Sequence, residues 1–505
     1  MFDDAEVCSA KGCSTFEGGD GEDADFVLYV SAKATSTCGP DVLGYALACK
    51  HDEIERPIMG RANFCPYSLK LDQREKALNV ALHEIMHALG FSKNYFWRWR
   101  NPATLEPLTA RDADGMPSGD NSAQCNFNDV YFPAASVAET FSERGFDKCS
   151  SKAERFDNNN CVTKIVTPLS VEAAKWYTGC ESMQGIELEN QVPGTCHNTG
   201  SHMEQRVYEG NLMTPIITLR PGMSGPVLAM MEDSGWYKAN WTSQDTYVKG
   251  NDWAYKLGCG FSKDDKCITD DEKVVPGGEG RFCAEKNTDS LCTSDHSALA
   301  YCDMVTHSGN LDSKYRYFED ARRGGSIKHF DYCPTINPFT NGLCSVEGQS
   351  FAAEQVGQDY GKDSLCFMTT AAYPRAGKPE PYRGRCIKAK CAQPTPGNYT
   401  LTLEFYVNDP FGNKEKPKAT CFAKETIPGP PGYHGTIDCP DPYEICHKST
   451  DLFIPTGQST SNGWALPSPS STVGPLPSSS PSPTTAPPCP SSTASPSPRQ
   501  GGLRS

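Results

Sequence analysis

Two histidines and a glutamate stand at a spacing that suits chemistry on a metal ion. The stretch His83-Glu84-Ile85-Met86-His87 has the form H-E-x-x-H. Residues four apart on an α-helix lie one turn above each other, so both imidazoles can point at one ion. Glu84 lies beside them, close enough to contact a water on that ion. The pattern therefore predicts one zinc ion bound by His83 and His87, with Glu84 as a general base.

Such a site is suited to hydrolysis of a carbonyl compound. Zinc lowers the pKa of its water to about 7, and Glu84 can accept the proton. The hydroxide then attacks the carbonyl carbon, and the ion stabilises the tetrahedral anion. Glu84 can finally pass the proton to the leaving amine. We therefore interpret the motif as that of a zinc-dependent endopeptidase.

The third protein ligand is open at this point. A catalytic zinc ion usually has three protein ligands. In the metzincin pattern H-E-x-x-H-x-x-G-x-x-H the third histidine follows soon after a glycine. Here Gly90 matches the glycine, but Lys93 occupies the position of that histidine. The third ligand must come from further along the chain, and the candidates are His197, His202, Glu106, Glu139 and Glu143.

The motif is expected on a helix that starts at Asp72. Asp72 can cap this helix, and Glu75 completes a capping box. An apolar stripe at helical spacing is formed by Leu78, Leu82, Ile85 and Leu89. We expect this helix to end at Gly90. We expect the stripe to pack on the core and the motif residues to lie on the opposite side.

Other elements are predicted around this helix. Residues Asp25–Ser31 read as a strand that buries Phe26, Val27, Leu28 and Val30. Short helices are expected over Ser170–Tyr177 and Ser224–Ser234. Together these elements indicate an α+β fold.

Composition narrows the class of protein. The chain has 505 residues and a formal net charge of −15, which argues against a nucleic-acid partner. No apolar run is long enough to cross a bilayer. The 24 cysteines are dispersed without a C-x-x-C pair, which fits disulfides made in an oxidising compartment. Sequons at Asn240 and Asn398 agree, so we expect an extracellular or cell-surface glycoprotein.

The ends of the chain suggest their own interpretation. The start, Met1-Phe2-Asp3-Asp4, is acidic and does not look like a secretory leader, so we expect a truncated amino terminus. We divide the rest by texture. Residues 1–103 form an amino-terminal catalytic subdomain with the zinc helix, and 104–245 form the remainder of the catalytic domain. A cysteine-rich domain is expected over 246–450, and a disordered Ser/Pro/Thr-rich tail over 451–505.

Two separate motifs resemble the leishmanolysin family of zinc metallopeptidases. The stretch from His83 to Ser92 (HEIMHALGFS) is similar to the zinc helix of that family. The later stretches are Gly200-Ser201-His202-Met203-Glu204 and Asn211-Leu212-Met213-Thr214-Pro215. The resemblance implies that His202 is the third zinc ligand and that Met213 forms an apolar floor beneath the ion. It also implies a metzincin-type catalytic domain followed by a disulfide-rich domain.

The resemblance extends to cysteine-rich stretches such as Asp331-Tyr332-Cys333-Pro334. It implies protein or peptide substrates and a possible association with the cell surface; nothing in the sequence sets the oligomeric state. The remaining histidines of the cysteine-rich half are read as surface or satisfied side chains, namely His296, His307, His329, His434 and His447.

Two alternatives remain. One is an inactive adhesion or binding protein of the same fold that uses its cysteine-rich domain. The other is a zinc peptidase of a different clan, with a glutamate as third ligand.

Overall fold

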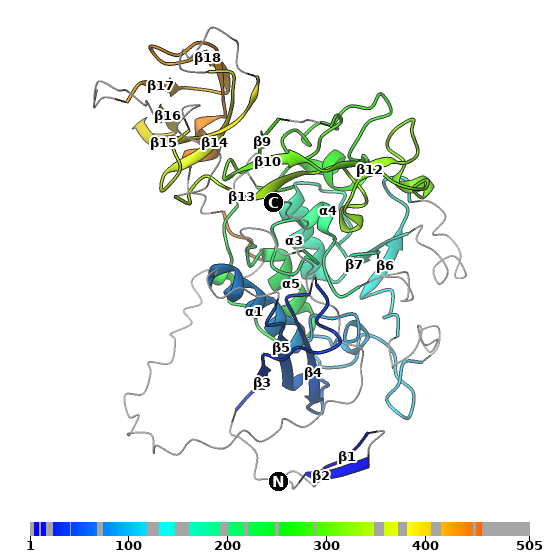
Figure 1. Cartoon of the computed structure of the whole chain (residues 1–505). Helices are drawn as coiled ribbons and strands as arrows, with labels where there is room; N and C mark the ends of the chain where they lie inside the picture. Colours follow the sequence, from blue (N-terminus) through cyan, green and yellow to red (C-terminus); the bar gives the residue numbers. More distant parts are fainter. Residues whose placement is uncertain are drawn as a thin grey trace, which may run out of the picture.

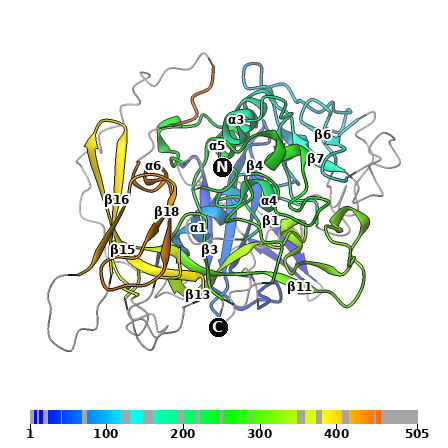
Figure 2. The same cartoon turned by 90° about the horizontal axis from the view of Figure 1, so that it is seen from above.

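The protein, seen here as a computed structural model, consists of small β-sheets and short helices (Figure 1). Figure 2 shows the molecule from above, and both views place the six-stranded sheet that contains β14 to β19 on the side away from β6 and β7. The structure describes residues 5–9, 12–16, 24–40, 42–67, 74–118, 131–146, 161–191, 200–216, 221–247, 252–286, 289–347, 358–371, 381–405, 416–447 and 451–456.

A three-stranded sheet packs against the helix that carries the H-E-x-x-H motif. Its spatial order is β3-β5-β4, with β3 parallel and β4 antiparallel to β5. The helix packs on β4 and β5, where Gly60 permits a close approach because a Cβ there would lie 2.9 Å from that of Ala88. The predicted strand is confirmed as β3, but the burial expected of it is not: Phe26, Val27 and Leu28 are half-buried and Val30 is exposed. The elements are β3 (Val27–Ser31), β4 (Gly44–His51), β5 (Pro57–Phe64) and α1 (Arg74–Ala88).

Helix α1 confirms the predicted helix and its end. It begins at Arg74 in the described part of the chain. The expected cap, Asp72, lies outside the described residues, and the side chain of Glu75 is not described either. After Ala88 the chain turns through Gly90, which has a φ of +105°. Glycine adopts this conformation without the strain that a side chain would cause.

The face by which α1 packs was predicted wrongly. Two residues of the expected apolar stripe, Leu78 and Leu82, are 57% and 39% exposed. The buried face carries His83, Glu84 and His87, which are 0%, 0% and 1% exposed. Periodicity favours burying leucine, but both imidazoles find hydrogen-bond partners inside the protein, which offsets the cost of burying them.

Two further helices pack side by side and confirm the helices predicted over Ser170–Tyr177 and Ser224–Ser234. Asp233 joins them, because its carboxylate accepts hydrogen bonds from the Thr167 hydroxyl at 2.6 Å and from the Ser170 amide at 2.7 Å. Beside them lies a sheet of order β6-β7-β8. The elements are α3 (Pro168–Thr178), α4 (Gln205–Tyr208), α5 (Gly225–Asp233), β6 (Ala138–Phe141), β7 (Val162–Ile165) and β8 (Ile186–Glu187).

The cysteine-rich half is made mostly of strands. Its largest sheet has the order β17-β16-β15-β14-β19-β18, and two smaller sheets have the orders β13-β10-β9 and β11-β12. The strands are β9 (Leu291–Cys292), β10 (Ala298–Cys302), β11 (Met304–Thr306), β12 (Arg323–Gly325), β13 (Ile336–Leu343), β14 (Ser364–Thr369), β15 (Arg383–Thr395), β16 (Asn398–Glu404), β17 (Lys418–Cys421), β18 (Glu425–Pro428) and β19 (Thr436–Cys439).

Short elements complete the described part. A hairpin near the amino terminus pairs β1 with β2. The remaining elements are β1 (Ala5–Ser9), β2 (Gly12–Phe16), η1 (Phe96–Arg98), η4 (Trp241–Ser243), η5 (Gly260–Asp264), η6 (Ser313–Tyr315), η7 (Lys328–Phe330) and α6 (Pro442–Cys446).

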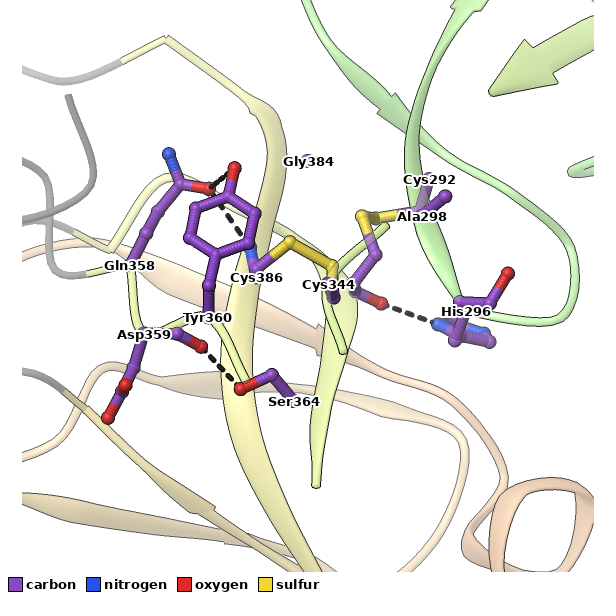
Figure 3. Close-up of a disulfide and its surroundings, with 12 residues drawn as sticks. Cys292, His296, Ala298, Cys344, Gln358, Asp359, Tyr360, Ser364, Gly384 and Cys386 are labelled. Atoms are coloured by element: carbon purple, nitrogen blue, oxygen red, sulfur yellow. Dashed lines mark hydrogen bonds between the residues drawn. A yellow bond between two sulfur atoms is a disulfide. The ribbon is translucent and has the colours of Figure 1, made fainter. Parts of the chain in front are cut away.

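Disulfides join segments of the chain that are between 18 and 79 residues apart. Figure 3 shows one such region, where the bond Cys344–Cys386 ties β15 to the chain after β13. Such bonds indicate folding in an oxidising compartment, as predicted. The pairs among the described residues are Cys38–Cys65, Cys180–Cys259, Cys267–Cys333, Cys283–Cys302, Cys292–Cys366, Cys344–Cys386, Cys391–Cys446 and Cys421–Cys439.

The apolar side chains gather in several clusters. The largest extends from Ala48 to Cys333 and so draws on both sides of the expected boundaries at 103 and 245. A second cluster is formed mainly by side chains of the six-stranded sheet. The domain boundaries themselves stay a prediction. In the described ranges, no helix has the length and apolarity that crossing a bilayer requires.

The first residues of the expected tail are ordered, which corrects the prediction of a disordered segment from 451 onward. Phe453 is 2% exposed and lies against Trp176 and Trp241, with ring centroids 5.7 and 5.3 Å away. Its amide donates to Gln244 at 3.0 Å, and its carbonyl accepts from the same side chain at 2.8 Å. The prediction failed because the composition of the tail does not show that Phe453 packs against Trp176 and Trp241, which lie far away in the sequence. Residues 457–505 lie outside the described part.

We expect Phe453→Ala to lower the free energy of unfolding by about 3 kcal/mol, since it removes a buried aromatic ring from a formed pocket. Urea unfolding followed by tryptophan fluorescence under oxidising conditions measures this loss. The matched control is Phe422→Ala, because Phe422 is 68% exposed and should change stability little. Equal midpoints for the two variants would show that the segment does not contribute to stability.

Candidate metal centre

Three histidines from two distant segments converge at one point. His83 and His87 come from α1, and His202 comes from the loop before α4. The Nε2 atom of His87 lies 3.0 Å from that of His83 and 3.2 Å from that of His202. Within the described ranges, these three residues form the one group of histidine, cysteine and carboxylate side chains that could hold a metal ion.

The second ring nitrogen of each histidine has its own acceptor. The Nδ1 atom of His83 donates to the Leu212 carbonyl, and that of His87 donates to the Phe91 carbonyl, both at 2.6 Å. The Nδ1 atom of His202 lies 2.6 Å from a carboxylate oxygen of Glu189. A histidine that donates from Nδ1 carries its lone pair on Nε2. The three lone pairs therefore face each other in the centre of the site.

This arrangement fits a metal ion better than it fits a protein hydrogen-bond network. Three lone pairs cannot bond to one another, but all of them can bind one cation. Tetrahedral zinc with bonds of about 2.0–2.1 Å would separate two ligand nitrogens by about 3.3 Å. The observed separations of 3.0 and 3.2 Å are close to that value. The three histidines thus fit the metal ion that the H-E-x-x-H motif implies.

The histidines are held in the neutral form that binds metals. Burial lowers the pKa of His83 well below its ordinary value, and the neighbouring His87 and His202 lower it further. Burial and His202 likewise lower the pKa of His87 to about 3. Near neutral pH both rings are therefore uncharged, and no proton has to be displaced when they bind a metal.

Glu84 is buried beside the histidines without a partner. Both of its carboxylate oxygens are inaccessible to solvent and make no hydrogen bond. Burial raises its pKa well above the ordinary value. Gly44 at the start of β4 faces this side chain, since a Cβ there would lie 3.2 Å from Oε1. An orphaned buried carboxylate is costly in structural terms and is typical of a functional group.

The turn after α1 brings together the two segments that carry the three histidines. Gly90 allows the chain to reverse so that the Phe91 carbonyl returns to His87. The next residues run past the third histidine: the amide of Lys93 donates to the Ser201 hydroxyl at 3.2 Å. Lys93 holds the position where the metzincin pattern has its third histidine. His202, which follows Ser201, therefore lies near Lys93, the residue that stands where the metzincin pattern has its third histidine.

The segment after His202 also contacts His83. The amide of Met203 donates to the Met213 carbonyl at 2.9 Å, and Leu212 accepts from His83. Met213 itself is fully buried. The turn that the resemblance identified therefore lies directly against the metal-ligand candidates, and the role of Met213 as a floor stays a prediction.

The other candidates for a third ligand do not join this group. Glu106 and Glu139 are exposed, and Glu143 is buried in an ion pair with Lys164 at 2.6 Å. His197 lies outside the described residues.

Sequence reasoning missed the residues that support the ligands. Glu189 carried no signal, because neither it nor the neighbouring Glu187 belongs to a recognisable motif in the stretch Ile186–Asn190. The carbonyls of Phe91 and Leu212 cannot be read from residue type at all. His329, which was read as a surface or satisfied histidine, is buried, and its Nδ1 lies 3.7 Å from Glu189.

Glu189 is charged in this setting. Burial alone would raise its pKa, but the adjacent His202 and the hydrogen bond to it lower the pKa to about 2. His329 and Lys93 act in the same direction. A carboxylate that contacts a histidine in this way fixes the ring's orientation and strengthens it as a ligand.

Comparison with known proteins agrees with this geometry. A family model described as leishmanolysin matches residues 3–125 and 132–451. The chain is 29% identical over 429 residues to a leishmanolysin-like peptidase of Caenorhabditis elegans, covering 77% of this chain and 62% of that protein. It is 32% identical over 366 residues to the leishmanolysin-like peptidase of Drosophila melanogaster, covering 67% and 51%. For leishmanolysin of Leishmania major the identity is 23% over 424 residues, covering 84% and 59%.

The class that these findings define is that of the metallopeptidases. The chain belongs to the leishmanolysin family. The resemblance drawn from the two zinc motifs is thereby confirmed. The chain spans between about half and about three fifths of the length of these relatives.

Stability of the metal-free protein should fall on acidification. The folded-state pKa of His87 is about 3, below the ordinary 6.5, so the unfolded chain binds more protons between these values. The contribution of His87 is therefore complete above about pH 6.5 and is lost progressively toward about pH 3. Tm measured across this range should drop less steeply for His87→Gln. Identical Tm profiles for the unaltered protein and His87→Gln would contradict a lowered pKa of His87 in the folded state.

Proposed function

We propose that the chain is a zinc-dependent endopeptidase of the metzincin type, with His83, His87 and His202 as zinc ligands and Glu84 as general base. The convergence of three buried imidazoles beside a carboxylate that has no hydrogen-bond partner carries this proposal. Family membership supports it independently.

Zinc is the ion that this donor set suits best. Three imidazole nitrogens with room for a water or substrate form the usual catalytic zinc site, while calcium and magnesium prefer oxygen ligands. A bound zinc ion would supply Lewis acidity, which makes a coordinated water more acidic and polarises a substrate carbonyl. One ion suffices, since the described residues bring together one such group.

Glu84 is placed to hold and move a proton. The residue follows His83 on α1, so its carboxylate lies next to the ligands without being one of them. Its missing hydrogen bonds leave both oxygens available to a water or an amine. Its raised pKa comes from burial, and a nearby cation would lower it toward the working range of a general base. Glu84 then takes a proton from the attacking water and returns it to the leaving amine.

An edge strand supplies a binding surface for an extended peptide. In the described sheet, β4 is an edge and pairs with β5 on its other side. Gly44 begins β4 and faces Glu84, since a Cβ there would lie 3.2 Å from Oε1, so this end of the edge strand lies beside the proposed base. Exposed strand edges bind peptides through main-chain hydrogen bonds. This supports proteins or peptides as substrates, cleaved within the chain.

Location and organisation follow as parts of the same proposal. The disulfides support a secreted or cell-surface protein. Asn240 and Asn398 of the two sequons are exposed, which is compatible with glycosylation. We retain the division into a catalytic part up to residue 245 and a cysteine-rich part after it.

Glu84→Gln should abolish peptide cleavage and leave zinc bound. The amide keeps the shape of the side chain but cannot accept the proton, and general-base catalysis typically contributes 10²- to 10⁴-fold. Cleavage of a quenched fluorescent peptide, with and without a chelator, measures the loss. The matched control is Glu106→Gln, because Glu106 is exposed. Zinc binding without cleavage by the unaltered protein would favour the inactive adhesion protein instead.

His202→Ala should lose zinc as well as activity, because only two ligands would remain. Metal content after dialysis, measured by mass spectrometry, tests this. His434→Ala is the matched control, since His434 is exposed and distant from the triad in sequence. Full zinc content in His202→Ala would point to another third ligand and to a different peptidase clan.

A further inference from the structure

We propose that Glu189 is a positioning residue that orients His202 toward the metal and strengthens it as a ligand. This inference rests on the proposed function, because it concerns the same site. Among the three histidines, His202 alone has a carboxylate as the partner of its Nδ1 atom; the other two donate to backbone carbonyls.

The need for such a residue follows from where the ligands come from. His83 and His87 share one helix, which fixes their relative position. His202 lies in a loop, 115 residues after His87, so α1 does nothing to orient its ring. The carboxylate of Glu189 contacts that ring at 2.6 Å, and both side chains are 3% exposed. Solvent therefore offers no competing partner.

The backbone holds the same two residues together. The amide of Glu189 donates to the His202 carbonyl, and the amide of Gly200 donates to the Glu189 carbonyl, both at 2.9 Å. Main chain and side chain of Glu189 thus both bond to the segment that carries the ligand. A rotation of His202 away from the metal would have to break this paired arrangement.

Gly200 shows that the loop is built around this carboxylate. A Cβ at residue 200 would lie 1.8 Å from Oε1 of Glu189 and 2.3 Å from its Cδ. No side chain fits there while the carboxylate bonds to His202. A glycine two residues before His202 is therefore required by the position of the Glu189 carboxylate.

The cysteine-rich half contributes a neighbour to the other oxygen of the carboxylate. The second oxygen of Glu189 lies 3.7 Å from Nδ1 of His329, in the short helix η7. His329 is 7% exposed. The contacts run from His202 through Glu189 to His329. A segment more than a hundred residues beyond the zinc motifs thereby takes part in aligning the third ligand.

The test compares zinc affinity in two variants that change different properties. Glu189→Gln keeps the shape and one hydrogen-bond acceptor but removes the charge. Gly200→Ala keeps the carboxylate but forces it away from His202. Loss of a residue that orients a metal-bound histidine typically weakens metal binding about 10- to 100-fold. We expect Kd, measured by competition with a chromophoric chelator, to rise by this factor in both variants.

Cobalt provides a signature that a general loss of stability would not change. Cobalt bound in place of zinc absorbs visible light according to its ligand geometry, so both variants should shift this spectrum. The control is Asp233→Asn, which removes another buried carboxylate that bonds to Thr167 and Ser170. It should lower Tm and leave zinc affinity and the cobalt spectrum unchanged.

The outcomes separate this inference from the proposed function. Unchanged Kd and cobalt spectrum in folded Glu189→Gln and Gly200→Ala would overturn the role of Glu189 while leaving the peptidase proposal intact. Weaker binding with an altered spectrum supports it, even if the unaltered protein cleaves no peptide. If Gly200→Ala does not fold, Glu189→Gln decides, because it adds no atom. Failure of the unaltered protein to bind zinc would overturn both proposals.

Discussion

The structure depends on three imidazole lone pairs that point at one another inside the protein. Nitrogen atoms at 3.0 and 3.2 Å with no proton between them repel, and a cation is the simplest way to satisfy all three. The lone pairs are fixed because each opposite nitrogen donates elsewhere. The acceptors of the three Nδ1 atoms lie in three different segments, at Phe91, Leu212 and Glu189. The metal-ligand candidates are thus held by the fold as a whole.

The carboxylate beside them adds to the strain of the metal-free site. Glu84 is fully buried with no hydrogen bond, and burial raises its pKa. Such a group lowers the stability of the fold, which is how functional sites commonly differ from the rest of a protein. A cation at the histidines would favour its charged form. The same ion would therefore relieve both the lone-pair repulsion and the desolvated carboxylate.

Local patterns predicted a good part of the fold. Helices α1, α3 and α5 and strand β3 lie where periodicity placed them. The buried face of α1 was wrong because leucines at helical spacing show amphipathicity, but not which side the surrounding protein covers. Leu78 and Leu82 are exposed. The start of the tail was wrong because the pocket for Phe453 is made by Trp176 and Trp241, far away in sequence.

The sequence by itself determined the spacing of His83, Glu84 and His87, the glycine turn at Gly90 and the family, because these depend on neighbours a few residues apart or on matched motifs. From the residues alone the third ligand was one of several candidates, and the family resemblance selected His202. Tertiary structure decided which acceptor orients each ring. It also decided that Glu189 contacts the ring of His202 and that His329 lies next to Glu189. The contacts of Leu212 with His83 and of His329 with Glu189 join segments more than a hundred residues apart, and no local periodicity specifies the packing that brings them together.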